Sequence, residues 1–155
     1  MQRTLVLAKP DAVQRGLIGQ IIGRFERKGL KVVGLRLLSV PGPMAEAHYA
    51  VHAGKHFYDG LVAFITSGPV AAVAIEGPDA IAVVRRMVGA TMPNEAEPGT
   101  IRGDFGVSGL RNLIHASDAP GTAETELALW FGADALVNYD REIDAWVVAE
   151  EPAGG

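Results

Sequence analysis

No cysteine occurs among the 155 residues of the chain. Disulfide bridges, zinc–thiolate sites and thiol nucleophiles are therefore excluded. The chain also lacks an apolar run of the roughly 18 residues that a membrane-spanning helix needs. Its first apolar run is short and ends at Lys9 and Pro10, so we expect no secretory signal. These absences predict a soluble, cytoplasmic protein with no membrane partner.

Basic residues are not in excess either. The chain has 14 Lys and Arg against 18 Asp and Glu, which gives a formal net charge of −4. Proteins that bind the backbone of a nucleic acid usually carry more Lys and Arg than this. A nucleic-acid-binding module is therefore disfavoured, and we expect no stable nucleic-acid partner. A pocket for a single nucleotide stays open, because a few basic side chains can converge locally.

The common phosphate-binding motifs are missing. There is no P-loop, Gly-x-x-x-x-Gly-Lys-Ser/Thr, and neither the glycine-rich loop nor the catalytic loop of protein kinases occurs. A chain that handles phosphate without them must use separate side chains. The candidates are Lys9, Arg85, Thr91, Arg102 and Asn112. For a lone Lys or Arg, a solvated surface position is the ordinary alternative.

Length and patterning predict the architecture. Hydrophobic residues make up 48% of the chain, enough for one buried core. We assign residues 1–149 to a single domain and 150–155 to a flexible C-terminal tail. The segment 89–109 has no clear periodicity, and a loop of that length in a compact domain is usually functional.

Apolar periodicity places the regular elements. We expect strands at 4–8, 30–40, 70–75 and 112–116, and a last short strand at 143–148. We expect helices at 17–27, 44–50, 58–66, 81–88 and 122–131. This order predicts an α+β fold, a ferredoxin-like sandwich in which helices cover one face of a four-stranded, mainly antiparallel sheet.

His115 is the strongest candidate for covalent chemistry. Two small residues follow it, Ala116 and the hydroxyl-bearing Ser117, and then the carboxylate of Asp118. Such neighbours would let a phosphate approach the ring closely, so the imidazole could act as a nucleophile. A histidine at the end of a strand is also often a hydrogen-bonded structural residue, and the local sequence leaves both interpretations open.

Glu126 follows His115 by eleven residues, on the next predicted helix. A strand–turn–helix return can bring its carboxylate under the imidazole. It would then hold one ring nitrogen as N–H and leave the other as a lone-pair nucleophile. The alternative is a solvated glutamate in the first turn, where it favours the helix dipole.

Two further patterns have both a functional and a packing interpretation. Phe57 and Leu61, four residues apart, either pack into the core or form an apolar cleft in which a nucleobase stacks. His48, His52 and His56 also recur at a spacing of four. No carboxylate is placed to complete a metal-ligand set with them, so we expect them to be exposed or to serve in packing.

Six motifs in order resemble those of nucleoside diphosphate kinases, over nearly the whole chain from Thr4 to about Trp146. They are Lys9-Pro10-Asp11-x-Val13-Gln14-Arg15-Gly16, His48-Tyr49, Ser67-Gly68-Pro69-Val70, Pro98 to Phe105, Arg111 to Asp118, and Glu126-x-x-Leu129-Trp130-Phe131. The resemblance implies a ferredoxin-like fold. It also implies ping-pong transfer of a γ-phosphoryl group, chiefly from ATP, to a nucleoside diphosphate through a phosphohistidine.

The resemblance also implies roles for single residues. His115 matches the catalytic histidine, which this family phosphorylates on Nδ1, and Glu126 matches the carboxylate tied to it. Tyr49 and Ser117 match residues that support the catalytic site. The matches at nucleotide-binding positions are Lys9, Arg85, Thr91 and Arg102 for the phosphates, Asn112 for the sugar hydroxyl, and Phe57 and Leu61 for the base.

The cofactor and partners follow from the same resemblance. Mg²⁺ would be carried by the nucleotide phosphates, so no protein metal ligands are expected. The partners would be nucleoside tri- and diphosphates. The chain would form a homo-oligomer, a tetramer or a hexamer, to which the loop around Pro93 contributes subunit contacts.

Three residues depart from the family pattern: Ala12 and Ala116 stand where glycine is usual, and Ala119 replaces a frequent serine. An alanine would be disfavoured if the backbone there needs a positive φ. A rival interpretation is a non-catalytic nucleotide-binding or regulatory protein that uses only Lys9, Arg102 and Phe57. The complete set of residues around His115 favours the enzyme.

Overall fold

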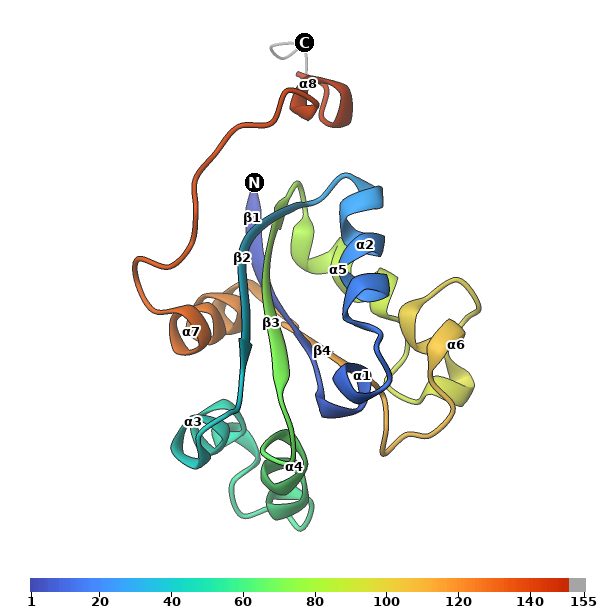
Figure 1. Ribbon diagram of the computed structural model, residues 1–155, viewed down its shortest axis with the longest axis vertical. Helices are drawn as coiled ribbons and strands as arrows, with labels where there is room; N and C mark the ends of the chain where they lie inside the picture. The colour runs from blue at the N-terminus through green and yellow to red at the C-terminus, as the bar shows by residue number, and fades with distance from the viewer. Residues whose placement is uncertain (151–155) are drawn as a thin grey trace.

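A four-stranded antiparallel sheet forms the centre of the molecule (Figure 1). The strands are β1 (Gln2–Ala8), β2 (Lys31–Leu38), β3 (Val70–Gly77) and β4 (Ile114–Ala116), in the spatial order β2-β3-β1-β4. This confirms the predicted α+β, ferredoxin-like architecture. The computed structural model describes residues 1–150, so residues 151–155 of the predicted tail lie outside the described part of the chain.

Ten helical segments connect and follow the strands. The α-helices are α1 (Pro10–Gln14), α2 (Ile18–Lys28), α3 (Gly42–His48), α4 (Tyr58–Ile65), α5 (Ala80–Val88), α6 (Ile101–Phe105), α7 (Pro120–Phe131) and α8 (Asp144–Val147). Two short 3₁₀ helices are η1 (Ala50–His52) and η2 (Pro93–Glu95). Within residues 1–150, no helix combines the length and apolar character needed to cross a bilayer.

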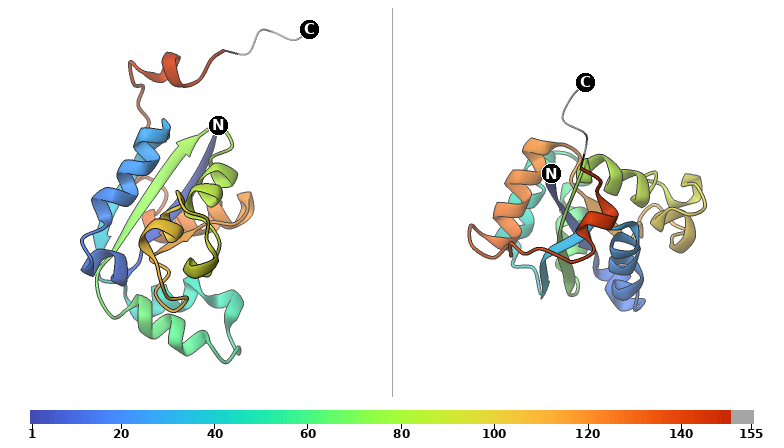
Figure 2. Two further views of the ribbon diagram at one scale, coloured as in Figure 1. Left: turned by 90° about the vertical axis from the view of Figure 1, so that its right-hand side faces the viewer. Right: turned by 90° about the horizontal axis from the view of Figure 1, so that it is seen from above.

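Helices cover both faces of the sheet, so the expectation that they cover one face is wrong. Seen from above, the sheet lies between α7 on one side and α2 with α5 on the other (Figure 2). The reason lies in β1, whose side chains are buried in alternation against the two faces. Val6 packs with α2 and α5, whereas Leu5 and Leu7 pack with α3, α4 and α7. A strand that is apolar on both sides needs a cover on both sides.

Two further expectations about local structure are corrected. The segment 143–148 is not a strand, because its backbone groups bond locally: Trp146 N–H donates to the Ile143 carbonyl and Val148 N–H to the Asp144 carbonyl. The segment 89–109 is not irregular throughout, since it contains η2 and α6. Thr100 caps α6 by accepting a hydrogen bond from the Gly103 amide.

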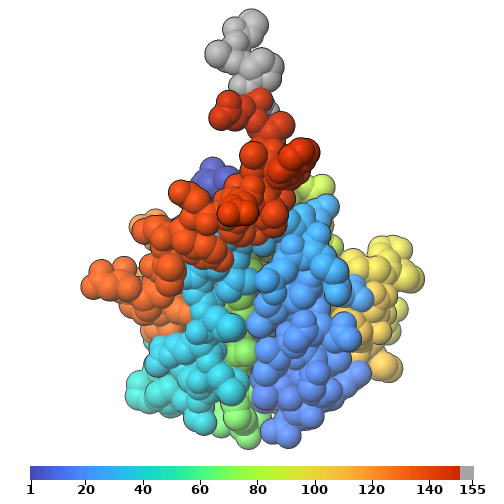
Figure 3. All heavy atoms as spheres, turned by 45° about the horizontal axis from the view of Figure 1, so that its top comes forward, coloured from blue at the N-terminus to red at the C-terminus, as the bar shows by residue number. Residues whose placement is uncertain are grey.

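The C-terminal segment lies across the ends of β2 and α2 (Figure 3). Val137 N–H donates to the Val33 carbonyl at 2.8 Å, and the Tyr139 hydroxyl donates to the Val32 carbonyl at 2.6 Å. Arg141 donates to the carbonyl of Gly29, which ends α2. These contacts protect part of the edge strand β2.

The pairing of β1 with β4 positions the candidate site. Leu7 is opposite His115 and Ala8 is opposite Ile114. The chain therefore leaves β1 at Lys9 beside the residues that lead into β4, and the Lys9 amide donates to the Leu113 carbonyl at 2.9 Å. Two segments about a hundred residues apart in the sequence thus form one corner of the fold.

Candidate active site

The His115 imidazole is paired with the Glu126 carboxylate. His115 Nε2 lies 2.8 Å and 3.1 Å from the two carboxylate oxygens. Because a carboxylate accepts hydrogen bonds, Nε2 carries the proton and Nδ1 keeps its lone pair. Glu126 sits on the buried face of α7 and is 8% exposed, so it is not the solvated first-turn glutamate of the alternative interpretation. The arrangement leaves Nδ1 free to act as a nucleophile.

Ser117 fixes the other side of the same carboxylate. Its hydroxyl donates to Glu126 Oε1 at 2.7 Å and accepts from the Leu5 amide at 3.3 Å. Burial alone would raise the pKa of Glu126. The hydrogen bonds from His115 and Ser117, with the nearby His48, instead hold this pKa below its ordinary value. Glu126 is therefore ionised and can stabilise positive charge on the imidazole.

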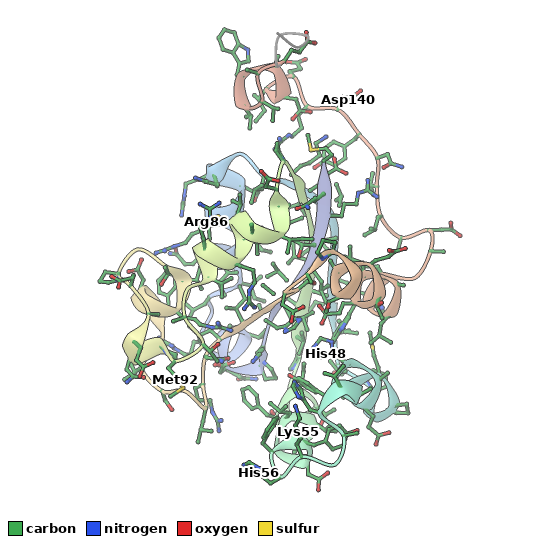
Figure 4. The ribbon with its side chains drawn as sticks, turned by 180° about the vertical axis from the view of Figure 1, so that it is seen from behind. His48, Lys55, His56, Arg86, Met92 and Asp140 are labelled. Atoms are coloured by element: carbon green, nitrogen blue, oxygen red, sulfur yellow. The ribbon has the colours of Figure 1, made fainter. Side chains whose placement is uncertain are left out.

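His48, which the sequence assigned only to exposure or packing, forms a wall of the site. Its ring meets the His115 ring edge to face at 4.6 Å between centroids. The indole N–H of Trp130 donates to His48 Nδ1 at 3.1 Å. Burial, followed by the neighbouring His115, lowers the pKa of His48 to about 4, so the ring is neutral. Figure 4 shows His48 next to the sheet, whereas His56 lies with Lys55 at the tip between α3 and α4.

The three histidines diverge because α3 ends at His48 and a different helix, η1, follows. Trp130 is the feature of the sequence that could have identified His48. It lies on the buried side of the predicted helix 122–131, where its indole N–H needs a hydrogen-bond acceptor, and His48 is that acceptor. Tyr49, the next residue, packs edge-on against the His48 ring. Burial and then Glu126 raise the pKa of Tyr49 to about 12, which keeps its hydroxyl protonated.

His48, His115 and Glu126 also form a group whose ligand atoms all lie within 4.8 Å of one another. Two imidazoles and one carboxylate suit a zinc-like ion. They do not suit Mg²⁺, which prefers an octahedral set of oxygens. The Glu126 oxygens are moreover already engaged by His115 and Ser117.

Lys9 and Asn112 form a second polar cluster. Lys9 Nζ donates to Asn112 Oδ1 at 2.9 Å, and Asn112 Nδ2 donates to the Thr91 carbonyl at 3.3 Å. Burial and then the charge of Arg102 lower the pKa of Lys9 to about 8, and Asp11 partly opposes this shift. An anion bound here would favour the charged ammonium.

Two arginines hold the backbone around His115. Arg102 is buried and donates to three carbonyls, those of Gly89, Asn112 and Ile114. Burial, with a contribution from Arg85, lowers its pKa to about 10. Arg85 reaches from α5 to the Ala116 carbonyl at 3.2 Å. The two guanidinium groups therefore bring positive charge to the carbonyls of the two residues that flank the histidine.

The turn before β4 contains an unusual backbone conformation. Leu113 has φ of 72°, and the Ile114 amide donates to the Asn112 carbonyl at 2.8 Å. This is a γ-turn of the rare, strained type. Among the described residues only Asp79 shares a positive φ without being glycine. Ala12, Ala116 and Ala119 are therefore not strained by their methyl groups, which answers the question that these departures raise.

The candidate base-binding residues lie on the α3–α4 hairpin. Phe57 directly precedes α4, is 40% exposed, and meets the rings of His52 and His56 edge to face. Leu61 is half-buried and packs against the core that lies under this face of the sheet.

A cavity of about 550 Å³ opens beside His115. Its lining includes Tyr49, Arg85, Asp118 and both members of the His48–His115 pair. The second cluster, Lys9 with Asn112 and Arg102, does not line this cavity. The structure thus divides the predicted residues into a histidine group that borders the cavity and a cationic group packed around the preceding turn.

Comparison with known proteins gives a consistent result. The family model described as "Nucleoside diphosphate kinase" matches residues 2–136. Curated relatives with that name include one from Archaeoglobus fulgidus, 55% identical over 97% of this chain and 99% of its own length. One from Picosynechococcus sp. is 56% identical over 95% and 99% of the two chains.

Solved structures agree in fold. A halophilic nucleoside diphosphate kinase from Halobacterium salinarum in complex with CDP has a TM-score of 0.93 and 53% identity, over 95% of this chain and 98% of its own. A nucleoside diphosphate kinase family protein from Babesia bovis has a TM-score of 0.93 and 44% identity, over 96% and 100%.

Proposed function

Because the chain belongs to the nucleoside diphosphate kinase family, we propose that His115 is the residue through which it carries a phosphoryl group. The donor is a nucleoside triphosphate, chiefly ATP, and the acceptor is a nucleoside diphosphate. The observation that supports this assignment most directly is the contact between His115 Nε2 and Glu126, which leaves Nδ1 as the free nucleophile.

The reaction takes place in two steps, phosphorylation of His115 and transfer from it to the acceptor. Nδ1 of His115 forms a bond to the γ-phosphorus while the bond from that phosphorus to the β-phosphate oxygen breaks, and the diphosphate leaves. The proton on Nε2 stays in its hydrogen bond to Glu126, which offsets the positive charge that develops on the ring. A terminal oxygen of a second diphosphate then attacks the phosphohistidine, and Nδ1 leaves. Dividing the transfer lets one site serve both nucleotides.

Side chains from both groups supply the phosphate contacts in this proposal, because Arg85 lines the cavity whereas Lys9 and Arg102 lie around the preceding turn. Lys9, Arg85, Thr91 and Arg102 spread the charge of the transferring group, as is usual for phosphoryl transfer. Bound anionic phosphates would raise the pKa of Lys9 from its lowered value of about 8 and so stabilise its charged form. Asn112, held between Lys9 and Thr91, is the group we assign to the sugar hydroxyl. Phe57 and Leu61 would hold the base.

Magnesium would enter as part of the substrate, bound to the nucleotide phosphates, and would offset part of their negative charge. The donor set beside His115 gives no reason to place it on the protein, because that set is mostly nitrogen.

We also propose that the chain acts as a homo-oligomer, a tetramer or a hexamer, in the cytoplasm. Exposed apolar side chains in the segment after α6 support an interface there: Val107 is 83% exposed and Leu110 is 81% exposed. This segment lies against the loop around Pro93, since Gly106 is close to Pro93 and Gly109 is close to Met92. Met92, on the same loop, is labelled in Figure 4.

The test is to incubate the protein with ATP labelled at the γ-phosphate. We expect an acid-labile, base-stable phosphoprotein that GDP discharges. His115→Gln should remove both the label and nucleotide exchange while the circular dichroism spectrum stays unchanged. Retained turnover in that variant would refute the nucleophile assignment. Nucleotide binding without label in the unaltered protein would favour the non-catalytic alternative.

A further inference from the structure

We propose that Asp11 is a positioning residue for this reaction: its carboxylate holds Leu113 in the positive-φ turn that aims His115. The inference rests on the proposed function of His115. Asp11 takes no part in the two chemical steps proposed above.

The turn needs to be held. A positive φ is uncommon for a residue with a Cβ and is a strained conformation for a bulky side chain. Leu113 has φ of 72° and its side chain is fully buried in the core. His115 follows two residues later, so relaxation of this turn would shift the start of β4 and the direction of the imidazole.

Asp11 and its neighbour Lys9 hold both polar backbone groups of Leu113. The Leu113 amide donates to Asp11 Oδ2 at 3.0 Å, across 102 residues of sequence. The Leu113 carbonyl accepts from the Lys9 amide at 2.9 Å. Asp11 lies in the first turn of α1, so its own backbone is fixed by the helix. The start of α1 therefore forms hydrogen bonds to both polar backbone groups of the strained residue.

Arg102 also forms hydrogen bonds to this turn. Its guanidinium donates to the carbonyls of Asn112 and Ile114, the two residues that flank Leu113. The Leu113 amide donates to neither of these carbonyls and has Asp11 as its partner. Asp11 is thus the side chain in this corner that satisfies the amide which the turn leaves without a backbone acceptor.

A second role for Asp11 must be separated from this one. Its negative charge opposes the lowering of the Lys9 pKa, although less strongly than burial and Arg102 promote it. Loss of Asp11 could therefore act through Lys9 rather than through the turn. The other carboxylate oxygen, Oδ1, is buried without a hydrogen-bond partner among the described residues. The Asp11 side chain therefore contacts the turn through the hydrogen bond that Oδ2 accepts from the Leu113 amide.

Two variants distinguish these roles. Asp11→Asn keeps an oxygen that can accept from the Leu113 amide but removes the charge, whereas Asp11→Ala removes both. The measurement is the single-turnover rate of His115 phosphorylation by ATP at pH 6.5, where Lys9 is protonated. We expect Asp11→Ala to lose about 10- to 100-fold in this rate, as when other orienting groups are lost, with KM for ATP changed by less than about 3-fold. Asp11→Asn should stay within about 3-fold of the unaltered protein.

A double-mutant cycle tests the link to the turn. Glycine adopts a positive φ at little cost, so Leu113→Gly should make the turn less dependent on its partner. The fold-loss caused by Asp11→Ala should therefore be smaller in the Gly-substituted background than in the unaltered one. The Leu113→Gly protein and the double variant share the cavity that the glycine creates, so the effect of the cavity cancels within that pair.

Ile21→Val is the matched control for stability, because it removes a buried methyl group from the core cluster that also contains Leu113 but removes no hydrogen bond of the turn. It should retain full activity. Normal phosphorylation in a folded Asp11→Ala protein would overturn the proposal. So would equal losses in Asp11→Asn and Asp11→Ala, or an equal effect of Asp11→Ala in both backgrounds. If Asp11→Ala does not fold, the test is deuterium exchange of the Leu113 amide in Asp11→Asn and in the control. We expect the two exchange rates to be equal. Faster exchange in Asp11→Asn would overturn the proposal. Absence of phosphohistidine in the unaltered protein would instead refute the proposed function.

Discussion

The surroundings of His115 and the α3–α4 hairpin both contribute to the proposed site, but they are built differently. In the His115 corner (residues 9–11, 112–117 and 126) the polar side chains next to the histidine are paired inside the protein, as in the bonds of Glu126 to His115 and Ser117. The α3–α4 hairpin (residues 42–66) presents apolar side chains to solvent: Phe57 is 40% exposed and Val51 is 81% exposed.

This difference indicates that the His115 corner carries out the phosphoryl transfer and that the hairpin binds the base. In the His115 corner the donors and charges are in place before a nucleotide arrives, so little reorganisation is needed in the transition state. In the hairpin, exposed apolar surface gains most when a base covers it, and stacking accepts any base. We therefore expect changes in the corner to lower the rate of transfer and changes in the hairpin to weaken binding.

Glu126→Gln should give the largest effect after loss of His115 itself. The amide keeps the size of the side chain but removes the charge that supports the imidazolium. We expect the single-turnover rate of His115 phosphorylation to fall by about 10- to 100-fold. Glu124→Gln, an exposed change on the same helix, is the matched control and should have no effect. If both variants react at the same rate, the His115 corner is not organised as we argue.

His48 lies where the two regions meet and gives the next largest effect, on stability. Its pKa is about 4 in the folded protein and about 6.5 when unfolded. The unfolded state therefore binds more protons between these values, so stability is lost as pH falls from about 6.5 to 4. We expect the free energy of unfolding to drop by about 3 kcal/mol over this range because of His48.

Urea unfolding at several pH values measures this. His48→Phe should remove the His48 part of the pH dependence, leaving the part that comes from carboxylates such as Glu126, whose pKa is lowered. His56→Gln, an exposed change at the tip of the hairpin, is the matched control. An identical pH dependence in His48→Phe and the unaltered protein would mean that the buried ring does not titrate as its surroundings indicate.

The sequence predicted the sheet well because its central strands are apolar on both sides, which gives runs that no exposed segment imitates. It also indicated that Glu126 could return to His115, since a short turn between a strand and a helix permits few other arrangements. The structure places the two in contact, whereas the catalytic and binding roles of these residues stay predictions.

What the sequence did not indicate depends on distant contacts. Helices α6 and α8 are too short to show a period, and the end of α3 at His48 breaks the apparent spacing of the histidines. The positive φ of Leu113 has no signature in residue type, because a buried leucine ordinarily avoids that conformation. Its explanation requires Asp11 and Arg102, from two other parts of the chain.

Phe57→Ala should give the smallest effect and tests the other half of the comparison. Removing an exposed ring leaves the His115 corner untouched, so kcat should change by less than about 2-fold. KM for ATP should rise by about 3- to 10-fold, since stacking of a base on an aromatic ring contributes about 1–3 kcal/mol when the ring is fully used. Asp59→Asn, an exposed change in the same hairpin, is the control. Because stacking tolerates every base, the rise in KM should be similar for ATP and GTP. A fall in kcat with unchanged KM would show that the hairpin participates in the chemistry, and the separation between the two regions would then be wrong.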